Sequence, residues 1–397
     1  MSFGTLVVIV LAGLGGPLLG LLNHRFVPVV VGEILAGILV GPAVLGVVDP
    51  ENATVAFLGE VGFAMLMLTV GIHLPLRDKR LGAAVRDGAL LAGIVCVLAV
   101  PAGILAASIS GGGHAAIYAV VLASGSAAVV LPAIQEGRLE GRDVLTVMAQ
   151  VTIADVVTIV LVPIVLQPSR AGHAVLGTAL VAGAAVLLLV AARLLDSGEW
   201  VHRVRHLSKT RHWALDLRIS LLVLFALAWL AQKGGTSILI AGFGVGVVVA
   251  LLGGPERLST QVRGIADGFF VPLFFVVLGS RLDLGGLVDD PKMLGLAAAL
   301  VALNVVIHLI STTLTRRAVP VALAATAQLG VPAAVASLGL SEHLLSPATA
   351  TAIVASALVS LAVCTVGVDL IAKPSAAAAG QERAEPPDAP AKAATAR

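Results

Sequence analysis

Long apolar segments recur along the whole chain, and they limit it to one broad class of fold. A helix of about 20 apolar residues is long enough to cross a hydrocarbon core of about 30 Å. Only 12% of the 397 residues are charged, whereas a soluble domain carries about 25%. The mean hydropathy is +1.04. We therefore expect an all-α polytopic membrane protein with about 13 transmembrane helices. The predicted spans are residues 4–22, 27–48, 53–73, 84–107, 114–134, 144–167, 174–195, 214–232, 237–253, 261–280, 293–314, 320–340 and 345–371.

The distribution of lysine and arginine supports this number of spans and predicts a topology. If the N-terminus lies outside, all 25 of these residues except Arg170, Lys233, Arg281 and Lys292 fall on the inner side. Loops on the cytoplasmic side carry such an excess of positive charge. We expect a protein of the inner (plasma) membrane with a cytoplasmic C-terminus. The net charge of +2, distributed by topology, gives no reason to expect a nucleic-acid partner.

Asp155 is the only ionisable residue in the span from Val144 to Gln167. It lies about midway between Asp143 and Arg170, so it should sit near the middle of the bilayer. A carboxylate at that depth costs on the order of 2.5–3.5 kcal/mol by insertion scales. A protonated or hydrogen-bonded acid that only holds two helices together remains an alternative, but the cost favours a functional role.

Two predicted spans are interrupted near their middle by small, polar and helix-breaking residues. The fifth span contains Ser-Gly-Ser-Ala-Ala at residues 124–128, and the twelfth contains Ala-Gln-Leu-Gly-Val-Pro at residues 327–332. Broken helices are tolerated in a membrane only where protein encloses the freed backbone groups. The two spans are an odd number apart, so they insert in opposite directions. Paired interruptions in an inverted repeat indicate a secondary-transport site, although each one alone could serve packing.

Three motifs resemble those of a known family. Residues 27–42 (VPVVVGEILAGILVGP), 58–71 (LGEVGFAMLMLTVG) and 269–284 (FFVPLFFVVLGSRLDL) are similar to its second, third and tenth helices. This family is the monovalent cation:proton antiporter-2 family, which includes the Kef-type and sodium/proton exchangers. The resemblance runs from about residue 4 to residue 370. It implies a sodium/proton antiporter fold, with inverted repeats and two crossing broken helices.

The resemblance also implies a division into domains. The scaffold would comprise residues 4–73 and 214–280, the core residues 84–167 and 293–371, and the linker helix residues 174–195. The scaffold would form a homodimer among membrane lipids. Residues 374–397 are rich in alanine and proline, and we expect a disordered cytoplasmic tail there.

In the family, an acid on the sixth span faces the crossing of the broken helices and carries either the cation or the proton. Here that residue is Asp155. The implied cation and proton ligands are Asp155, Ser124, Ser126 and Thr152, and the implied crossing residues are Gly125, Ala127, Gln328 and Gly330. For each hydroxyl, a bond to its own helix backbone is the alternative, and it is the favoured one for Thr152. Ala127 and Ala154 depart from the family pattern, since many relatives carry polar residues at these places.

His308 and Glu33 are two further candidates inside apolar spans. His308 is the only ionisable residue between Met293 and Leu314, and burial should keep it neutral. It could pair with Asp155 and sense pH, or simply bond to a backbone carbonyl. Glu33 could line an ion entrance or satisfy backbone groups in the scaffold.

Other features offer little chemistry. The hydrophilic loop from Asp196 to Arg218 contains three histidines, His202, His206 and His212. We interpret it as a solvated basic linker, because cysteine and carboxylate ligands are missing nearby. Cys96 and Cys364 fall inside apolar spans, so no disulfide, structural metal or cofactor is expected.

These observations favour a transporter over an enzyme. The expected activity is antiport of Na⁺ or K⁺ against H⁺ by alternating access, electroneutral because one carboxylate serves both ions. The alternatives are a Kef-like potassium efflux pathway, an organic-anion/sodium symporter, and a membrane sensor that does not transport. The efflux pathway is not favoured, because the sequence shows no regulatory nucleotide-binding pattern. The symporter is not favoured, because no Arg or Lys is found at the centre of the predicted site.

Overall fold

The computed structural model describes residues 2–22, 29–73, 81–136, 139–168, 171–196, 213–233, 237–253 and 256–372, and every regular element in them is a helix. The all-α prediction is confirmed. The histidines of the central loop and the C-terminal tail lie outside these residues.

In chain order the helices are α1 (Phe3–Gly13), α2 (Gly15–Leu22), α3 (Val29–Val40), α4 (Ala53–His73), α5 (Leu81–Ile109), α6 (Ala115–Ala123), α7 (Ala127–Glu136), α8 (Arg142–Leu166), α9 (Ala171–Asp196), α11 (Leu215–Lys233), α12 (Ile238–Leu252), α13 (Glu256–Ile265), the π-helical turn η2 (Ala266–Phe270), α14 (Val271–Ser280), α15 (Leu284–Asp289), α16 (Pro291–Leu314), α17 (Val319–Ala324), α18 (Gly330–Ser341) and α19 (Pro347–Ala372).

The surface of the helices is that of a multi-pass membrane protein. Within the described residues, nine helical segments are long and apolar enough to cross a membrane, and α3, α12 and α18 are shorter apolar helices. Large apolar side chains such as Val97, Leu187 and Leu222 are exposed on α5, α9 and α11, where a soluble protein would carry charge. Every predicted span coincides with one or more helices, but the number of thirteen crossings stays a prediction.

Some predicted spans differ from the observed helices in detail. The second span was expected to reach residue 48, but α3 ends at Val40. Gly41 and Pro42 follow it, and proline removes a backbone donor and disfavours helix in the residue before it. The tenth span contains the π-helical turn η2 between α13 and α14. The short helix α15 was not predicted.

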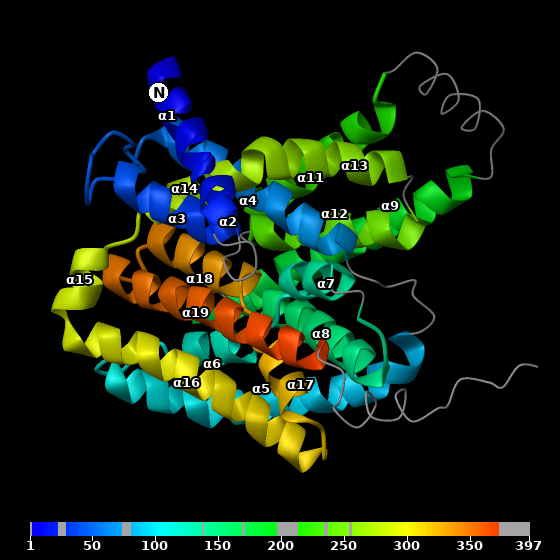
Figure 1. Cartoon of the computed structure of the whole chain (residues 1–397). Coiled ribbons are helices and arrows are strands. Elements are labelled where there is room, and N and C mark those ends of the chain that lie inside the picture. The colour runs from blue at the N-terminus through cyan, green and yellow to red at the C-terminus, as the bar shows by residue number, and fades with distance from the viewer. Residues whose placement is uncertain are drawn as a thin grey trace, which may run out of the picture.

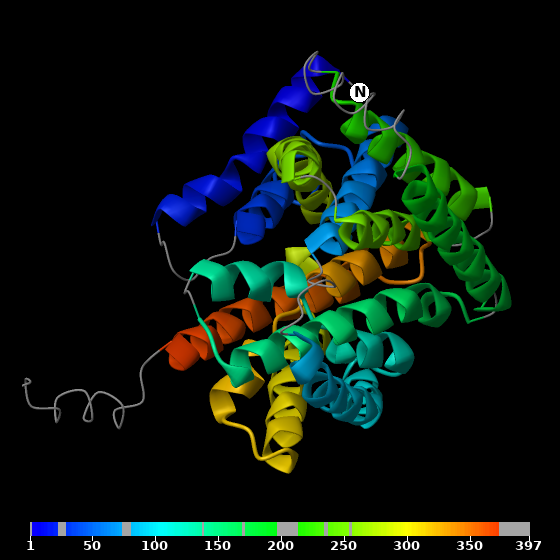
Figure 2. The same ribbon diagram turned by 90° about the vertical axis from the view of Figure 1, so that its right-hand side faces the viewer.

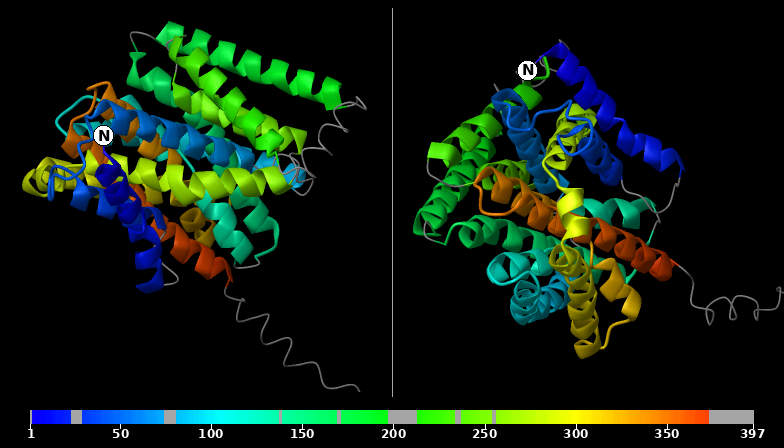
Figure 3. Two further views of the ribbon diagram at one scale, coloured as in Figure 1. Left: turned by 90° about the horizontal axis from the view of Figure 1, so that it is seen from above. Right: turned by 90° about the vertical axis from the view of Figure 1, so that its left-hand side faces the viewer.

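Two groups of helices lie side by side. Helices α1–α4 pack with α12–α14, and helices α5–α8 pack with α16–α19. Figures 1 and 2 show the first group in the upper part of the molecule and the second in the lower part. Helix α9 contacts α8, α11 and α12, and it lies at the margin opposite α1 and α2 (Figure 3). The two groups meet where α4 contacts α7, α12 contacts α8, and α14 contacts α18.

Two close helix crossings hold the first group together. Helix α3 crosses α14 where a Cβ atom on Gly37 would lie 2.3 Å from the carbonyl oxygen of Val276. Helix α4 crosses α12 where a Cβ atom on Gly246 would lie 2.4 Å from the carbonyl oxygen of Leu68. Small residues allow such approach where lipid supplies no hydrophobic drive between helices. The crossings pair the second span with the tenth and the third with the ninth, as an inverted repeat requires.

A charge network joins three elements at one end of the second group. Arg317, after α16, donates from Nη1 to Asp143 Oδ1 at 2.9 Å and from Nη2 to Asp87. Arg142 at the start of α8 donates to the same Asp87 carboxylate at 2.9 Å. The Arg317 side chain is 15% exposed, against 77% for Arg142. Arg317 is therefore the central cation of the network.

Replacing Arg317 with Gln should lower the apparent melting temperature of the purified protein in detergent. The change leaves the Asp87 and Asp143 carboxylates close together without their shared cation. Arg316→Gln is the matched control, because Arg316 is exposed and takes no part in the described network. Size-exclusion chromatography after heating gives the measurement. Equal melting temperatures for the two variants would show that the network adds no stability.

Candidate functional site

Asp155 lies in the middle of α8 and is buried inside the second group of helices. Only 2% of its surface is exposed. Helix α8 contacts α6, α7, α17 and α18, which are the four half-helices formed by the two interrupted spans. The predicted break residues thus lie between half-helices that all pack against the helix carrying Asp155. Figure 1 shows α8 beneath α7, and α8 is in contact with α7 and α17.

The first break places a backbone donor next to the carboxylate. Helix α6 ends at Ala123 and α7 begins at Ala127. The N–H group of Ala127 donates to Asp155 Oδ2 at 3.1 Å. The first N–H groups of a helix have no partner within it, and they carry the positive end of the helix dipole. Asp155 therefore caps α7, which stabilises the ionised carboxylate.

Gly125 explains how this break can reach α8. A Cβ atom on Gly125 would lie 2.8 Å from the carbonyl oxygen of Val151 and 2.9 Å from its Cα atom. Val151 lies one turn before Asp155 on the same helix. A larger residue at position 125 would push the break away from α8, so glycine sets the distance from Ala127 to Asp155.

The second break meets the first one. Helix α17 ends at Ala324 and α18 begins at Gly330. Between them, the buried Gln328 donates from Nε2 to the carbonyl oxygen of Leu122 at 3.4 Å. Leu122 belongs to the last turn of α6. Gly330 lies against α4, since a Cβ atom there would stand 3.6 Å from Met67 Cε.

The three candidate hydroxyl ligands differ in their bonds. Ser124 donates to the carbonyl oxygen of Val121 at 2.7 Å, in its own helix. Ser126 is buried between the half-helices. The Thr152 hydroxyl is buried and has no hydrogen-bond partner among the described residues, so it does not make the expected bond to its own helix backbone. Thr152 lies one turn before Asp155 on the same face.

His308 pairs with its own helix. Its Nδ1 atom donates to the carbonyl oxygen of Asn304 at 2.8 Å, and the side chain is buried. Within the described part of the chain, no hydrogen bond or ion pair joins His308 to Asp155. This bond agrees with the simpler interpretation of His308, in which the histidine bonds to a backbone carbonyl.

Asn304 and Gln150 are polar residues that the sequence reasoning missed. The fully buried Asn304 donates from Nδ2 to the carbonyl oxygen of Thr326 at 2.9 Å and to Ser360 Oγ at 3.0 Å. It therefore braces the second break from α16. The side-chain oxygens of Asn304 and Gln150 are buried without a partner among the described residues. An amide in an apolar span is the signal that could have found both, but neither residue carries a charge or lies at a predicted break.

The arrangement can bind one small cation or one proton. A dehydrated monovalent cation needs several oxygen ligands. Asp155 supplies a carboxylate, and Thr152, one turn away on the same face, supplies a buried oxygen that has no partner among the described residues. Buried oxygens rarely stay without a partner, so such groups suit a ligand that comes and goes. Among the described residues, no group of three or more His, Cys, Asp or Glu side chains could hold a metal ion.

The chain is similar to known membrane transporters. The family model described as "Sodium/hydrogen exchanger, transmembrane" matches residues 6–373. The chain is 26% identical over 312 residues to the putative Na(+)/H(+) antiporter YjbQ of Bacillus subtilis, covering 74% of this chain and 50% of YjbQ. It is 24% identical over 268 residues to the Na(+)/H(+)-K(+) antiporter GerN of Bacillus cereus, covering 66% of this chain and 67% of GerN. The chain thus spans about half the length of YjbQ and two thirds of GerN.

The fold also has a solved counterpart. The sodium proton antiporter MjNhaP1 from Methanocaldococcus jannaschii matches with a TM-score of 0.60 at 15% sequence identity. The match covers 93% of this chain and 95% of MjNhaP1. At this identity the likeness concerns the fold, and it confirms the antiporter architecture that the sequence motifs implied.

Proposed function

Because the chain belongs to the sodium/hydrogen exchanger family, we propose that it exchanges a monovalent cation, Na⁺ or K⁺, for H⁺ across a bacterial plasma membrane. The single observation that carries the proposal is the position of Asp155. It is a buried carboxylate that meets the N-terminus of the half-helix α7, next to the place where the two broken helices touch. The names of YjbQ and GerN support the same activity.

Asp155 would carry the two ions in turn. A bare carboxylate is expensive at this depth, whereas a protonated or cation-bound carboxylate is neutral. If only the neutral forms move between the two sides, uptake of one ion requires release of the other. The Ala127 N–H and the α7 dipole offset part of the free-energy cost of the ionised form, which lets a cation take the place of the proton. Thr152 and Ser126 would complete the cation shell, while Ser124, bonded within α6, would shape the break.

Alternating access would move one helix group against the other. Helices α5–α8 and α16–α19 would form the moving core, and α1–α4 with α11–α14 the scaffold, with α9 as the link. The close glycine crossings support a rigid scaffold, and the border between α4, α12, α14 and α7, α8, α18 supplies a sliding surface. The scaffold would dimerise among membrane lipids, with the N-terminus outside and the C-terminus in the cytoplasm.

An exchange assay tests the proposal directly. Everted membrane vesicles with an internal pH dye are energised and then challenged with Na⁺, K⁺ or Li⁺. Exchange predicts that one or more of these cations dissipates the pH gradient in vesicles containing the protein and not in empty ones. A protein that responds to none of them across a range of pH would refute cation/proton exchange.

Transport should be electroneutral, because one carboxylate binds either one monovalent cation or one proton. In proteoliposomes, a potassium diffusion potential of either sign, set with valinomycin, should leave the initial rate of Na⁺-driven proton movement unchanged. A control without valinomycin gives the reference rate. A rate that rises with one sign of the potential and falls with the other would show that net charge crosses with each cycle.

A further inference from the structure

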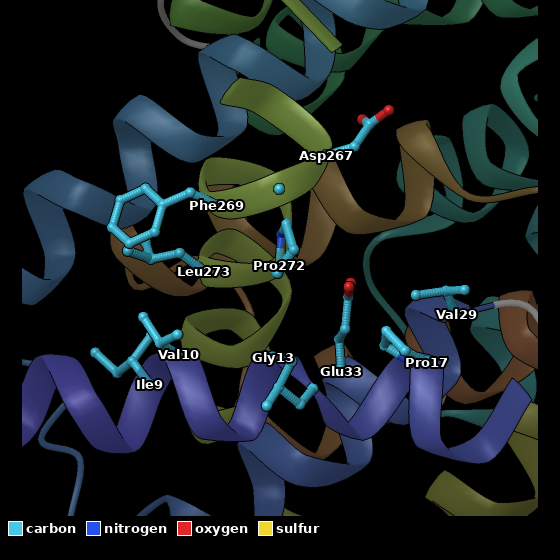
Figure 4. A pocket seen from close by; sticks show the side chains of 12 residues that line it. Ile9, Val10, Gly13, Pro17, Val29, Glu33, Asp267, Phe269, Pro272 and Leu273 are labelled. Carbon is cyan, nitrogen blue, oxygen red and sulfur yellow. The ribbon is translucent and has the colours of Figure 1, made fainter. Parts of the chain in front are cut away.

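A second cavity lies in the first helix group, away from Asp155. It has a volume of about 240 Å³ and lies between α1, α3 and the junction of η2 with α14. Figure 4 shows Ile9 and Gly13 of α1 along one side and Phe269, Pro272 and Leu273 along the other. The remaining lining residues are Val10, Leu14, Pro17, Val29, Glu33, Asp267 and Gly268. Most of its wall is apolar, and among the described residues Glu33 and Asp267 are the two charged ones in it.

Glu33 stands out in this wall. Its side chain points into the cavity from α3 (Figure 4), and only 3% of the residue is exposed. No hydrogen bond or ion pair joins Glu33 to another part of the described chain. A buried carboxyl group without a partner costs free energy in either protonation state. The cavity beside it supplies the space in which a partner can bind.

The walls indicate the chemistry of that partner. A dehydrated metal ion would need about five or more oxygen ligands. The cavity instead offers one buried carboxylate among alkyl and aromatic groups. An organic ammonium ion needs a single carboxylate for its charge and brings apolar surface for the walls to cover. The ring of Phe269 suits both an apolar group and a cation. The volume of the cavity lies near the lower end of the range for ligand pockets, which begins at about 300 Å³. The cavity therefore fits a small molecule.

The cavity opens beside the exposed residues Asp267 and Gly268 on η2. A lipid headgroup that carries an ammonium also carries a phosphate, which the Glu33 carboxylate would repel. A free amine therefore fits better than a lipid.

We propose that the Glu33 cavity binds a small apolar organic ammonium ion. The ammonium group pairs with the Glu33 carboxylate, and the apolar part lies against α1 and Phe269. No residue of the Asp155 site lines this cavity. Binding there is thus separate from cation/proton exchange, and it places a ligand between the N-terminal helix and the rest of the scaffold.

Isothermal titration calorimetry on the purified full chain tests the site with 2-phenylethylammonium at neutral pH. We expect saturable binding with one molecule per chain. The neutral 2-phenylethanol, which has nearly the same shape, measures partition into detergent and should not saturate. Glu33→Gln should weaken ammonium binding by about tenfold or more. Glu60→Gln, a matched change at a carboxylate outside this cavity, and Asp155→Asn should both bind as the wild type does.

A second variant keeps the test decisive if Glu33→Gln does not fold. Leu14→Trp fills the cavity from the turn between α1 and α2 without changing charge, and it should also weaken binding. Repeating the titration in nanodiscs with and without phosphatidylethanolamine separates a free amine from a headgroup, and equal affinity is expected. The proposal is overturned if the alcohol binds as tightly as the ammonium. It is equally overturned if the folded Glu33 and Leu14 variants bind normally, if Na⁺ alone binds in a Glu33-dependent way, or if phosphatidylethanolamine abolishes binding.

Discussion

Replacing Asp155 with Asn is expected to abolish cation-driven proton exchange, lowering the initial rate by about 100-fold or more, which corresponds to roughly 2.7 kcal/mol. Asparagine keeps an oxygen that can accept from the Ala127 N–H, so the local fold should survive. Asparagine cannot exchange a proton for a cation, because its amide neither ionises nor releases a proton in the pH range of the assay. The vesicle assay with a pH dye measures the rate, normalised to the amount of folded protein in the membrane.

Asp369→Asn is the matched control for this variant. Asp369 is an exposed aspartate near the end of α19, outside the site, and its replacement should leave the rate close to that of the wild type. If Asp155→Asn transports as fast as this control, Asp155 is not the carrier. The alternative of an acid that only holds two helices together would then be preferred.

Gly125→Ala should be the second most damaging change. The added methyl group would lie 2.8 Å from the carbonyl oxygen of Val151, so the break between α6 and α7 must move away from α8. That movement lengthens the bond from Ala127 to Asp155. We expect exchange to fall by about tenfold or more, with a loss of stability of about 1–3 kcal/mol from overpacking. The same vesicle assay and thermal stability in detergent provide the two measurements.

Gly93→Ala separates this effect from the general cost of altering a glycine in a helix. Gly93 lies on α5, is exposed, and has open space where a Cβ atom would be placed. This variant should keep both transport and stability. Wild-type exchange by folded Gly125→Ala protein would show that the contact with Val151 does not set the geometry of Asp155.

The fold followed from patterns that act at short range along the chain. Apolar length predicts helices that cross a membrane, because the hydrocarbon core leaves no other way to satisfy the backbone. The motifs around Glu33, Glu60 and Phe274 identified the antiporter fold, which the family model and the likeness to MjNhaP1 confirm. The end of α3 at Val40 and the π-helical turn η2 were missed, since hydropathy averages over such local changes.

The site could be predicted only in part. Asp155 was identified by the free-energy cost of a carboxylate in the middle of a membrane span. The two breaks were identified by their small and polar residues. Asn304 was missed because it lies in an uninterrupted apolar span and carries no charge, although its bonds to Thr326 and Ser360 hold the second break. His308 was identified as a candidate partner of Asp155, but its bond within α16 depends on a rotamer that sequence does not reveal.

The sequence alone therefore determined the membrane class, the family resemblance, the unusual acid at mid-span and the two places where helices break. Only the tertiary structure decided which groups meet. It brought the Ala127 N–H to Asp155, Gln328 to Leu122 and Arg317 to two carboxylates, and it opened a cavity beside Glu33. The physical reason is that apolar spacing encodes which residues avoid water, whereas hydrogen bonds and cavities depend on how distant helices pack against one another.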